Sequence, residues 1–184
     1  MQALVDAAVG DYPARVVAVG VDRDCRAVEI AAAASIPSFR VGLKDYGSRA
    51  EWDAALTGMA AEHHPDLIVS AGFMKILGPE FLSRFTGRVV NTHPALLPAF
   101  PGAHAVPDAL GYGVRVTGCT VHLVDAGVDT GPILAQHAVE VLDGDDKSTL
   151  HERATAGERR LFGDVLAALA TCGVNRRGRK ATLG

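Results

Sequence analysis

Apolar positions in the first half of the chain follow two alternating patterns, short β-branched runs and longer stretches with helical spacing. The β-branched runs are bounded by residues typical of turns and predict strands at 15–21, 66–70 and 88–91. The other stretches favour helices at 2–9, 25–35, 49–63 and 79–85. Ser48 is placed to cap the third of these helices, and Pro79 opens the fourth. Strands that alternate with helices predict an α/β fold with a largely parallel central sheet.

After Asn91 the pattern changes to a proline-rich loop followed by two longer apolar strands. The loop spans 93–107 and contains four prolines, and a short helix is expected near 108–112. Strands are expected at 116–124 and 133–141, on either side of a turn at 125–132, as a C-terminal antiparallel extension of the sheet. An amphipathic helix is expected from Thr149 to about residue 170, and the basic segment 176–180 is expected to be a solvated end.

No internal repeat or linker interrupts this order of elements. We therefore expect one domain over residues 1–184. Its N-terminal, mostly parallel α/β half would cover 1–91. Its second half, 92–184, would hold the catalytic loops, the hairpin and the C-terminal helix.

Composition narrows the class of protein. The chain has 184 residues, of which 48% are hydrophobic and 21% charged, as expected of a globular domain. A net charge of -3 and 5% aromatic residues argue against a nucleic-acid-binding surface. Three cysteines without a CxxC pair fit neither a disulfide framework nor a zinc site. We find no transmembrane run and no signal-peptide pattern, so we expect a cytoplasmic protein that binds no membrane.

Asn91 and His93 are the first candidate chemical pair. Ligands of open α/β sheets bind at the carboxyl ends of strands, and residues i and i+2 of a strand point the same way. An amide and an imidazole on one face suit a reaction that develops negative charge on a carbonyl oxygen. Asp129, in the turn at 125–132, is the carboxylate best placed to keep the histidine protonated.

Structural interpretations of the same residues remain open at this level. A histidine before a proline can simply be part of a loop, and an aspartate between glycines in a turn often forms an Asx-turn. Among the other histidines, only His104 is expected near the site. The residues alone therefore predict an enzyme-like cleft without naming a substrate.

Four motifs carry a resemblance to a known family. They are AGFMKIL at 71–77, NTHPALLP at 91–98, PGAH at 101–104 and VDTGPI at 128–133. In this order and spacing the chain resembles the folate-dependent formyltransferases, most closely those of purine biosynthesis, from about Gln2 to Arg179. The resemblance implies a Rossmann-like formyltransferase fold.

The resemblance also implies a reaction and a catalytic trio. A formyl group would pass from 10-formyltetrahydrofolate, the folate co-substrate, to the amine of glycinamide ribonucleotide, with no metal. Asn91 and His93 would hold the oxyanion of the tetrahedral intermediate. Asp129 would raise the pKa of the histidine and help to move a proton from the attacking nitrogen to folate N10.

Further residues are assigned binding roles by the same resemblance. Arg49 would meet the glutamate tail of the folate, and Asn91 would also contact the folate. The backbone of Met74, Lys75, Ile76 and Leu77 would line the pterin pocket. Pro94 and Glu158 would contact the nucleotide substrate. The protein would act as a monomer or homodimer.

The N-terminus departs from the family pattern. Family members begin with a strand and a glycine-rich loop whose backbone amides bind the substrate phosphate, whereas this sequence starts just past that loop. We expect a misassigned start or a truncated chain. Two alternatives to the transferase follow: a formyltetrahydrofolate hydrolase, or an inactive folate-binding remnant that lacks the phosphate loop.

Overall fold

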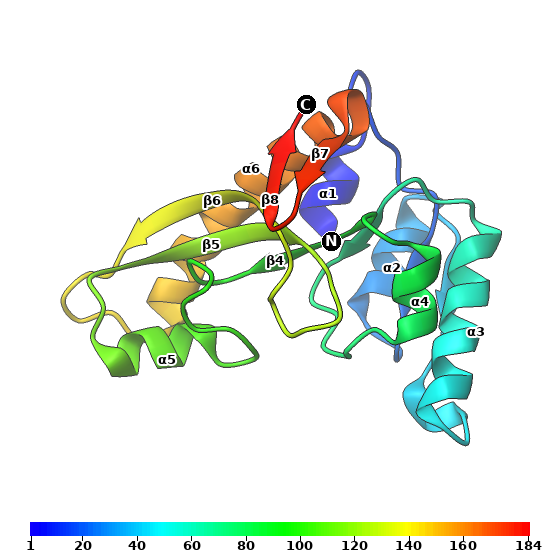
Figure 1. The fold of residues 1–184 in the computed structure, drawn as a ribbon, viewed down its shortest axis with the longest axis horizontal. Coiled ribbons are helices and arrows are strands. Elements are labelled where there is room, and N and C mark those ends of the chain that lie inside the picture. The colour runs from blue at the N-terminus through cyan, green and yellow to red at the C-terminus, as the bar shows by residue number, and fades with distance from the viewer. The chain divides into compact units, whose positions relative to one another are not determined.

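The computed structural model describes residues 1–184 and divides into two compact units, Met1–Val89 and Val90–Gly184. The first unit alternates helices with short strands (Figure 1). Its elements are α1 (Gln2–Ala7), β1 (Val19–Val21), α2 (Arg26–Ala33), β2 (Ser38–Arg40), the 3-10 helix η1 (Leu43–Asp45), α3 (Arg49–Glu62), β3 (Ile68–Ser70) and α4 (Pro79–Arg84).

Strands β1 and β2 pair in parallel, with Gly20 opposite Phe39. Val19 and Val21 of β1 form a buried apolar cluster with Ala31 of α2. The strand expected at 15–21 is shorter in the structure, because the ladder can extend only as far as its three-residue partner β2. The predicted parallel strand geometry and the α/β class are confirmed.

Helix α3 begins as the sequence predicts. Ser48 has extended backbone angles, and its hydroxyl oxygen accepts a hydrogen bond from the Glu51 amide at 3.1 Å. This hydrogen bond satisfies one of the free N–H groups at the helix start. On its inner face, the buried Trp52 donates from its indole nitrogen to the Val41 carbonyl oxygen at 3.0 Å. The helix is therefore fixed at both its start and its buried side.

The start of α4 is capped from another helix. Gly78 occupies the N-cap position and offers no side-chain acceptor. Instead, the carboxylate of the buried Asp53 in α3 accepts hydrogen bonds from the amides of Glu80 at 2.8 Å and Phe81 at 3.4 Å. A Cβ atom at position 78 would overlap this carboxyl group, so only glycine permits the approach. The cap fixes the chain directly after the AGFMKIL motif.

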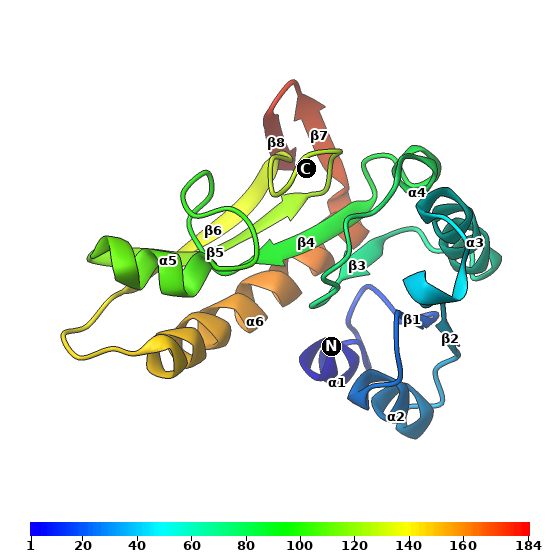
Figure 2. The ribbon, with the colours of Figure 1, turned by 90° about the horizontal axis from the view of Figure 1, so that it is seen from below.

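The second unit is built on an antiparallel sheet and one long helix. Its elements are β4 (Val89–His93), α5 (Ala105–Tyr112), β5 (Val116–Leu123), β6 (Ile133–Glu140), α6 (Lys147–Cys172), β7 (Val174–Arg177) and β8 (Lys180–Leu183). Strand β5 pairs antiparallel with both β4 and β6. Helix α6 packs along one face of β5 and β6, and the turn between these strands lies on the other side (Figure 2).

The strand register assigns side chains to the two faces of this sheet. Asn91 lies opposite His122 and His93 opposite Thr120, so these four side chains share one face. The side chain of Thr92, which lies between Asn91 and His93 in the strand, belongs to the opposite face, along which α6 packs. The sheet therefore separates a loop face from a helix face.

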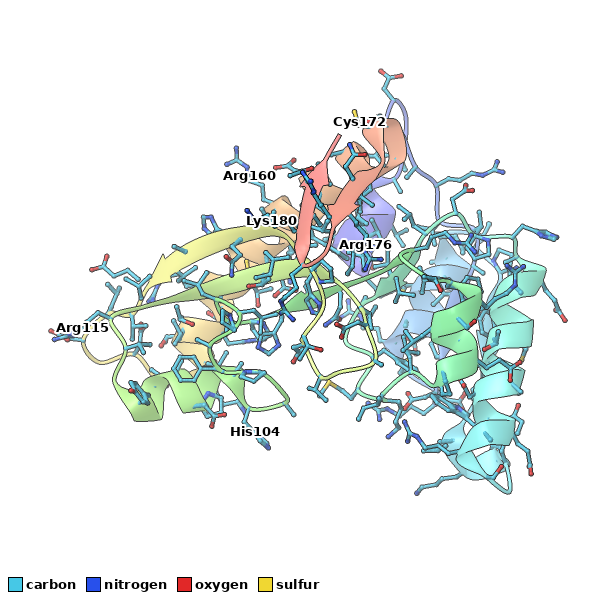
Figure 3. All side chains as sticks on the ribbon, viewed as in Figure 1. His104, Arg115, Arg160, Cys172, Arg176 and Lys180 are labelled. Atoms are coloured by element: carbon cyan, nitrogen blue, oxygen red, sulfur yellow. The ribbon has the colours of Figure 1, made fainter.

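The basic segment 176–180 is exposed to solvent, as expected, but it belongs to a regular hairpin rather than to an irregular end. Strands β7 and β8 form an antiparallel hairpin that turns at Gly178, whose φ is +64°. Arg176 and Lys180 stand on its two strands and are exposed (Figure 3). Contacts of β8 with β6 and α6 hold the hairpin, because Ala181 and Leu183 give it a partly buried side.

Candidate active site

His93 ends β4 with its imidazole buried between two oxygen atoms. Its Nδ1 lies 3.2 Å from Asp129 Oδ2, and its Nε2 lies 2.7 Å from the Phe100 carbonyl oxygen. Both neighbours are hydrogen-bond acceptors, and only an imidazolium has a proton on each ring nitrogen. This geometry lets an imidazolium donate one N–H to a carboxylate and the other to a carbonyl oxygen.

Asp129 is held by a tight turn between β5 and β6. Its φ of +54° lies in the left-handed region, which aspartate and asparagine tolerate better than most residues. The Gly102 amide donates to Oδ2 at 2.8 Å, so this oxygen has a second donor beside His93. Asp125 stabilises the turn by accepting hydrogen bonds from the Gly127 amide and the Thr130 hydroxyl. The proximity of His93 and Asp129, inferred from the sequence, is confirmed.

His122 completes the cluster from β5. Its Nδ1 lies 2.9 Å from the Leu123 carbonyl oxygen and so carries the hydrogen, which leaves a lone pair on Nε2. The Asn91 amide nitrogen donates to that lone pair at 3.2 Å. Burial lowers the pKa of His122, although the Leu123 carbonyl and the Asp129 charge oppose this effect. Asp129 Oδ1 is 3.6 Å from Nε2, too far for a hydrogen bond, and we therefore treat His122 as neutral.

Sequence reasoning missed His122 and placed His104 near the site instead. That expectation is wrong for His122, whose ring directly contacts Asn91. His104 is the exposed N-cap residue of α5, and its side chain points outward (Figure 3). The cross-strand register of β4 and β5 is the signal that would have identified His122, because it sets His122 opposite Asn91.

The loop after His93 is tied to the sheet by a polar network. The buried Thr120 hydroxyl donates to the Ala95 carbonyl oxygen at 2.7 Å and accepts from the Leu97 amide at 3.1 Å. Gln136 of β6 donates both to this hydroxyl at 3.0 Å and to the Leu97 carbonyl oxygen at 2.9 Å. These bonds use the full capacity of the Thr120 hydroxyl. They fix the root of the loop that brings Phe100 to His93.

Glu158 and Pro94 also belong to this second unit. Glu158 projects from α6, and its Oε1 accepts a hydrogen bond from the Thr92 hydroxyl at 2.7 Å. Pro94 directly follows His93 and fixes the chain direction there. Pro94 therefore directly follows the strand that bears Asn91 and His93, and Glu158 contacts that strand through Thr92.

The remaining predicted residues lie in the first unit. The Arg49 guanidinium donates to the Ile76 carbonyl oxygen, and it lies 5.6 Å from the centre of the Trp52 ring. Met74 and Ile76 are 65% and 59% exposed, unusual for large apolar side chains. Lys75 Nζ is 3.9 Å from Asp22, and Leu77 is half-buried. Arg49 thus anchors a segment that displays apolar side chains to solvent.

The cluster formed by Asn91, His93, His122 and Asp129 suits one kind of chemistry. An imidazolium N–H beside a neutral amide can stabilise an oxyanion, and a carboxylate in contact with the imidazolium can accept a proton. No group of three or more His, Cys, Asp or Glu side chains is arranged to hold a metal ion. The cluster is therefore suited to acyl transfer through a tetrahedral intermediate.

Comparisons with known proteins agree with this chemistry. Residues 1–166 match the formyl transferase family. A phosphoribosylglycinamide formyltransferase of Mycobacterium tuberculosis is 70% identical over 184 residues, which cover 100% of this chain and 86% of the relative. The same enzyme of Bacillus subtilis is 41% identical over 156 residues, 85% of this chain and 79% of the relative.

A solved structure with a similar fold supports the sequence matches. The crystal structure of glycinamide ribonucleotide transformylase 1 from Symbiobacterium toebii has a TM-score of 0.96 and 40% identity, over 99% of this chain and 87% of that one. This likeness confirms the predicted Rossmann-like formyltransferase fold. By sequence match and by structure, the chain belongs to the formyl transferase family.

Proposed function

We propose that this chain transfers a formyl group from 10-formyltetrahydrofolate to the amine of glycinamide ribonucleotide, a step of purine biosynthesis. The enzymes named in the comparisons support the reaction. The observation that carries the proposal is the His93 imidazole, held between a carboxylate and a carbonyl oxygen, with Asn91 on the same face of its strand. Neither the hydrolase nor the inactive remnant draws support from these relatives.

The reaction begins when the amine nitrogen attacks the formyl carbon. The carbonyl electrons move to oxygen, which becomes an oxyanion. His93 Nε2–H, which donates to the Phe100 carbonyl oxygen in this structure, donates to the oxyanion instead. Asn91 supplies a neutral donor to the same oxygen. The Phe100 carbonyl thus marks the direction in which the oxyanion is bound.

Proton transfer completes the exchange. The attacking nitrogen loses a proton, folate N10 leaves with the electron pair of its bond to carbon, and N10 takes up a proton. Asp129 accepts the first proton through water, while its contact with His93 keeps the imidazolium oriented. The proton released by one nitrogen is therefore balanced by the proton gained by the other.

The binding residues proposed here are those that the resemblance to the family implies. Arg49 pairs with carboxylates of the folate tail, and the backbone of Met74, Lys75, Ile76 and Leu77 lines the pterin pocket. Asn91 contacts the folate as well as the reacting oxygen. Pro94 and Glu158 contact the nucleotide. The carboxylate of Glu158 accepts hydrogen bonds from hydroxyl or amine groups and repels phosphate.

The wider setting is also part of the proposal. The substrates are small molecules, and the enzyme acts in the cytoplasm as a monomer or homodimer, without nucleic acid. No helix of this chain has both the length and the apolar character needed to cross a membrane.

The test measures release of tetrahydrofolate from 10-formyltetrahydrofolate with and without glycinamide ribonucleotide. The parent chain should turn over only with the nucleotide, and His93→Ala should lower kcat by about 100-fold or more. His151→Ala, which removes an exposed histidine of α6, is the matched control and should keep full activity. Turnover without nucleotide would indicate the hydrolase, and folate binding without any turnover would indicate the remnant.

A further inference from the structure

Thr92 stands between two candidate catalytic residues but faces away from them. Side chains alternate along a strand, so Asn91 and His93 point to the loop face of the sheet and Thr92 to the helix face. On that face the Thr92 hydroxyl donates to Glu158 Oε1 at 2.7 Å. A hydroxyl that donates to an ionised carboxylate makes a short, charge-assisted hydrogen bond. One strand therefore contacts the reacting groups on one face and an acid of α6 on the other.

The close approach of α6 to the sheet makes this contact possible. Gly157 precedes Glu158, and a Cβ atom there would overlap the His137 ring of β6. Glycine weakens a helix interior, so its presence here is explained by the space that it leaves for that ring. At this point α6 lies near enough to the sheet for a half-buried Glu158 to reach β4.

Besides the Thr92 hydroxyl, the Glu158 carboxylate has a buried thiol in its surroundings. Cys119 of β5 is fully buried on the same face, and burial, followed by the charge of Glu158, raises the pKa of its thiol to about 11. The thiol is therefore neutral and a weak donor near neutral pH. Thr92 provides the strong hydrogen bond that sets the direction of the Glu158 carboxylate.

We propose that Thr92 is a positioning residue that fixes Glu158 for the nucleotide substrate. The inference rests on the proposed role of Glu158 in binding that substrate. With Oε1 held by Thr92, Oε2 is presented in one direction to the hydroxyl or amine donors of the nucleotide. Without Thr92, the carboxylate can turn toward water, and each binding event must order it again. The same strand then sets the position of the nucleotide relative to Asn91 and His93.

Thr92→Val tests the inference because valine keeps the shape and removes the donor. We expect the KM for the nucleotide to rise roughly tenfold, the lower range for losing a hydrogen bond to a charged group. The kcat and the KM for 10-formyltetrahydrofolate should stay within about twofold, because the contact does not involve the reacting oxygen. Thr92→Ser keeps the hydroxyl and should restore the nucleotide KM. Thermal unfolding of each variant verifies that it is folded.

Glu158→Ala separates failure of this inference from failure of the proposed function. If Glu158→Ala raises the nucleotide KM while Thr92→Val leaves it unchanged, Thr92 does not position Glu158. A Thr92→Val variant that loses kcat with an unchanged nucleotide KM would also overturn the inference. The double variant Thr92→Val/Glu158→Ala should have the nucleotide KM of Glu158→Ala alone, and a further increase would show that Thr92 acts elsewhere. The proposed function itself is tested separately, by the nucleotide dependence of turnover in the parent chain and by the His93→Ala variant.

Discussion

Asp129→Asn is the substitution that most cleanly removes the charge beside His93. Asparagine has nearly the same shape as aspartate and tolerates the φ of +54° at this position, where alanine would be strained. The turn should therefore keep its conformation. What changes is the contact at 3.2 Å between a carboxylate oxygen and His93 Nδ1, together with the acceptor for the Gly102 amide.

The magnitude follows from the separation and the burial of the pair. At 3.2 Å and an effective dielectric constant of about 20, two full charges attract by about 5 kcal/mol. The side chains are 4% and 13% exposed, so solvent screens this attraction little. Asparagine retains an oxygen acceptor, which recovers part of the energy. A net loss of about 3–4 kcal/mol of transition-state stabilisation corresponds to a kcat/KM lowered roughly 100- to 1000-fold.

The assay is steady-state formyl transfer with both substrates varied. Asp125→Asn removes the same charge from the same turn without touching His93, and it serves as the matched control. The control should lose less than about threefold in kcat/KM. The reasoning is refuted if folded Asp129→Asn loses less than about tenfold, or if both variants lose the same amount.

Three further predictions concern buried polar groups. Thr120→Val leaves two backbone partners of the loop unpaired, so the free energy of unfolding should fall by about 2–4 kcal/mol in urea titrations; a loss below about 1 kcal/mol would contradict this. Alkylation of the native chain at pH 8 should label two of the three cysteines and spare Cys119, whose thiol has a pKa of about 11, as mass spectrometry can count. Burial lowers the pKa of His122, so below about pH 6.5 the unfolded chain binds a proton at this ring that the folded chain does not bind. The free energy of unfolding therefore decreases as the pH is lowered. The Tm should therefore drop more between pH 7 and 5.5 in the parent than in His122→Asn, and equal drops would contradict the argument.

Much of the architecture can be predicted from the sequence because its elements depend on residues that are close together in the chain. The Ser48 cap, the proline that opens α4 and the two long strands β5 and β6 each depend on residues close in the chain. The extent of β1 depends instead on its partner β2, and no local pattern shows that the partner is only three residues long. The C-terminal hairpin was missed because four basic residues around Gly178 conceal the alternation of its partly buried side.

The candidate site divides in the same way. Asn91 and His93 are two residues apart on one strand, so their shared direction is a local property. Asp129 was found through its motif, and its contact with His93 could only be inferred. His122 lies among apolar residues of β5 and looks like part of the core until the register sets it opposite Asn91. The Phe100 contact uses a backbone carbonyl oxygen, which no residue type can reveal.

The most direct test of the central claim follows the transferred carbon itself. 10-Formyltetrahydrofolate labelled with ¹³C in the formyl group is incubated with the chain and glycinamide ribonucleotide, and the product is identified by NMR. We predict the label as an N-formyl group on the nucleotide, formed at a rate that His93→Ala lowers by about 100-fold or more and that His151→Ala preserves. Label released as formate, or label that appears on the nucleotide equally fast with His93→Ala, would contradict it.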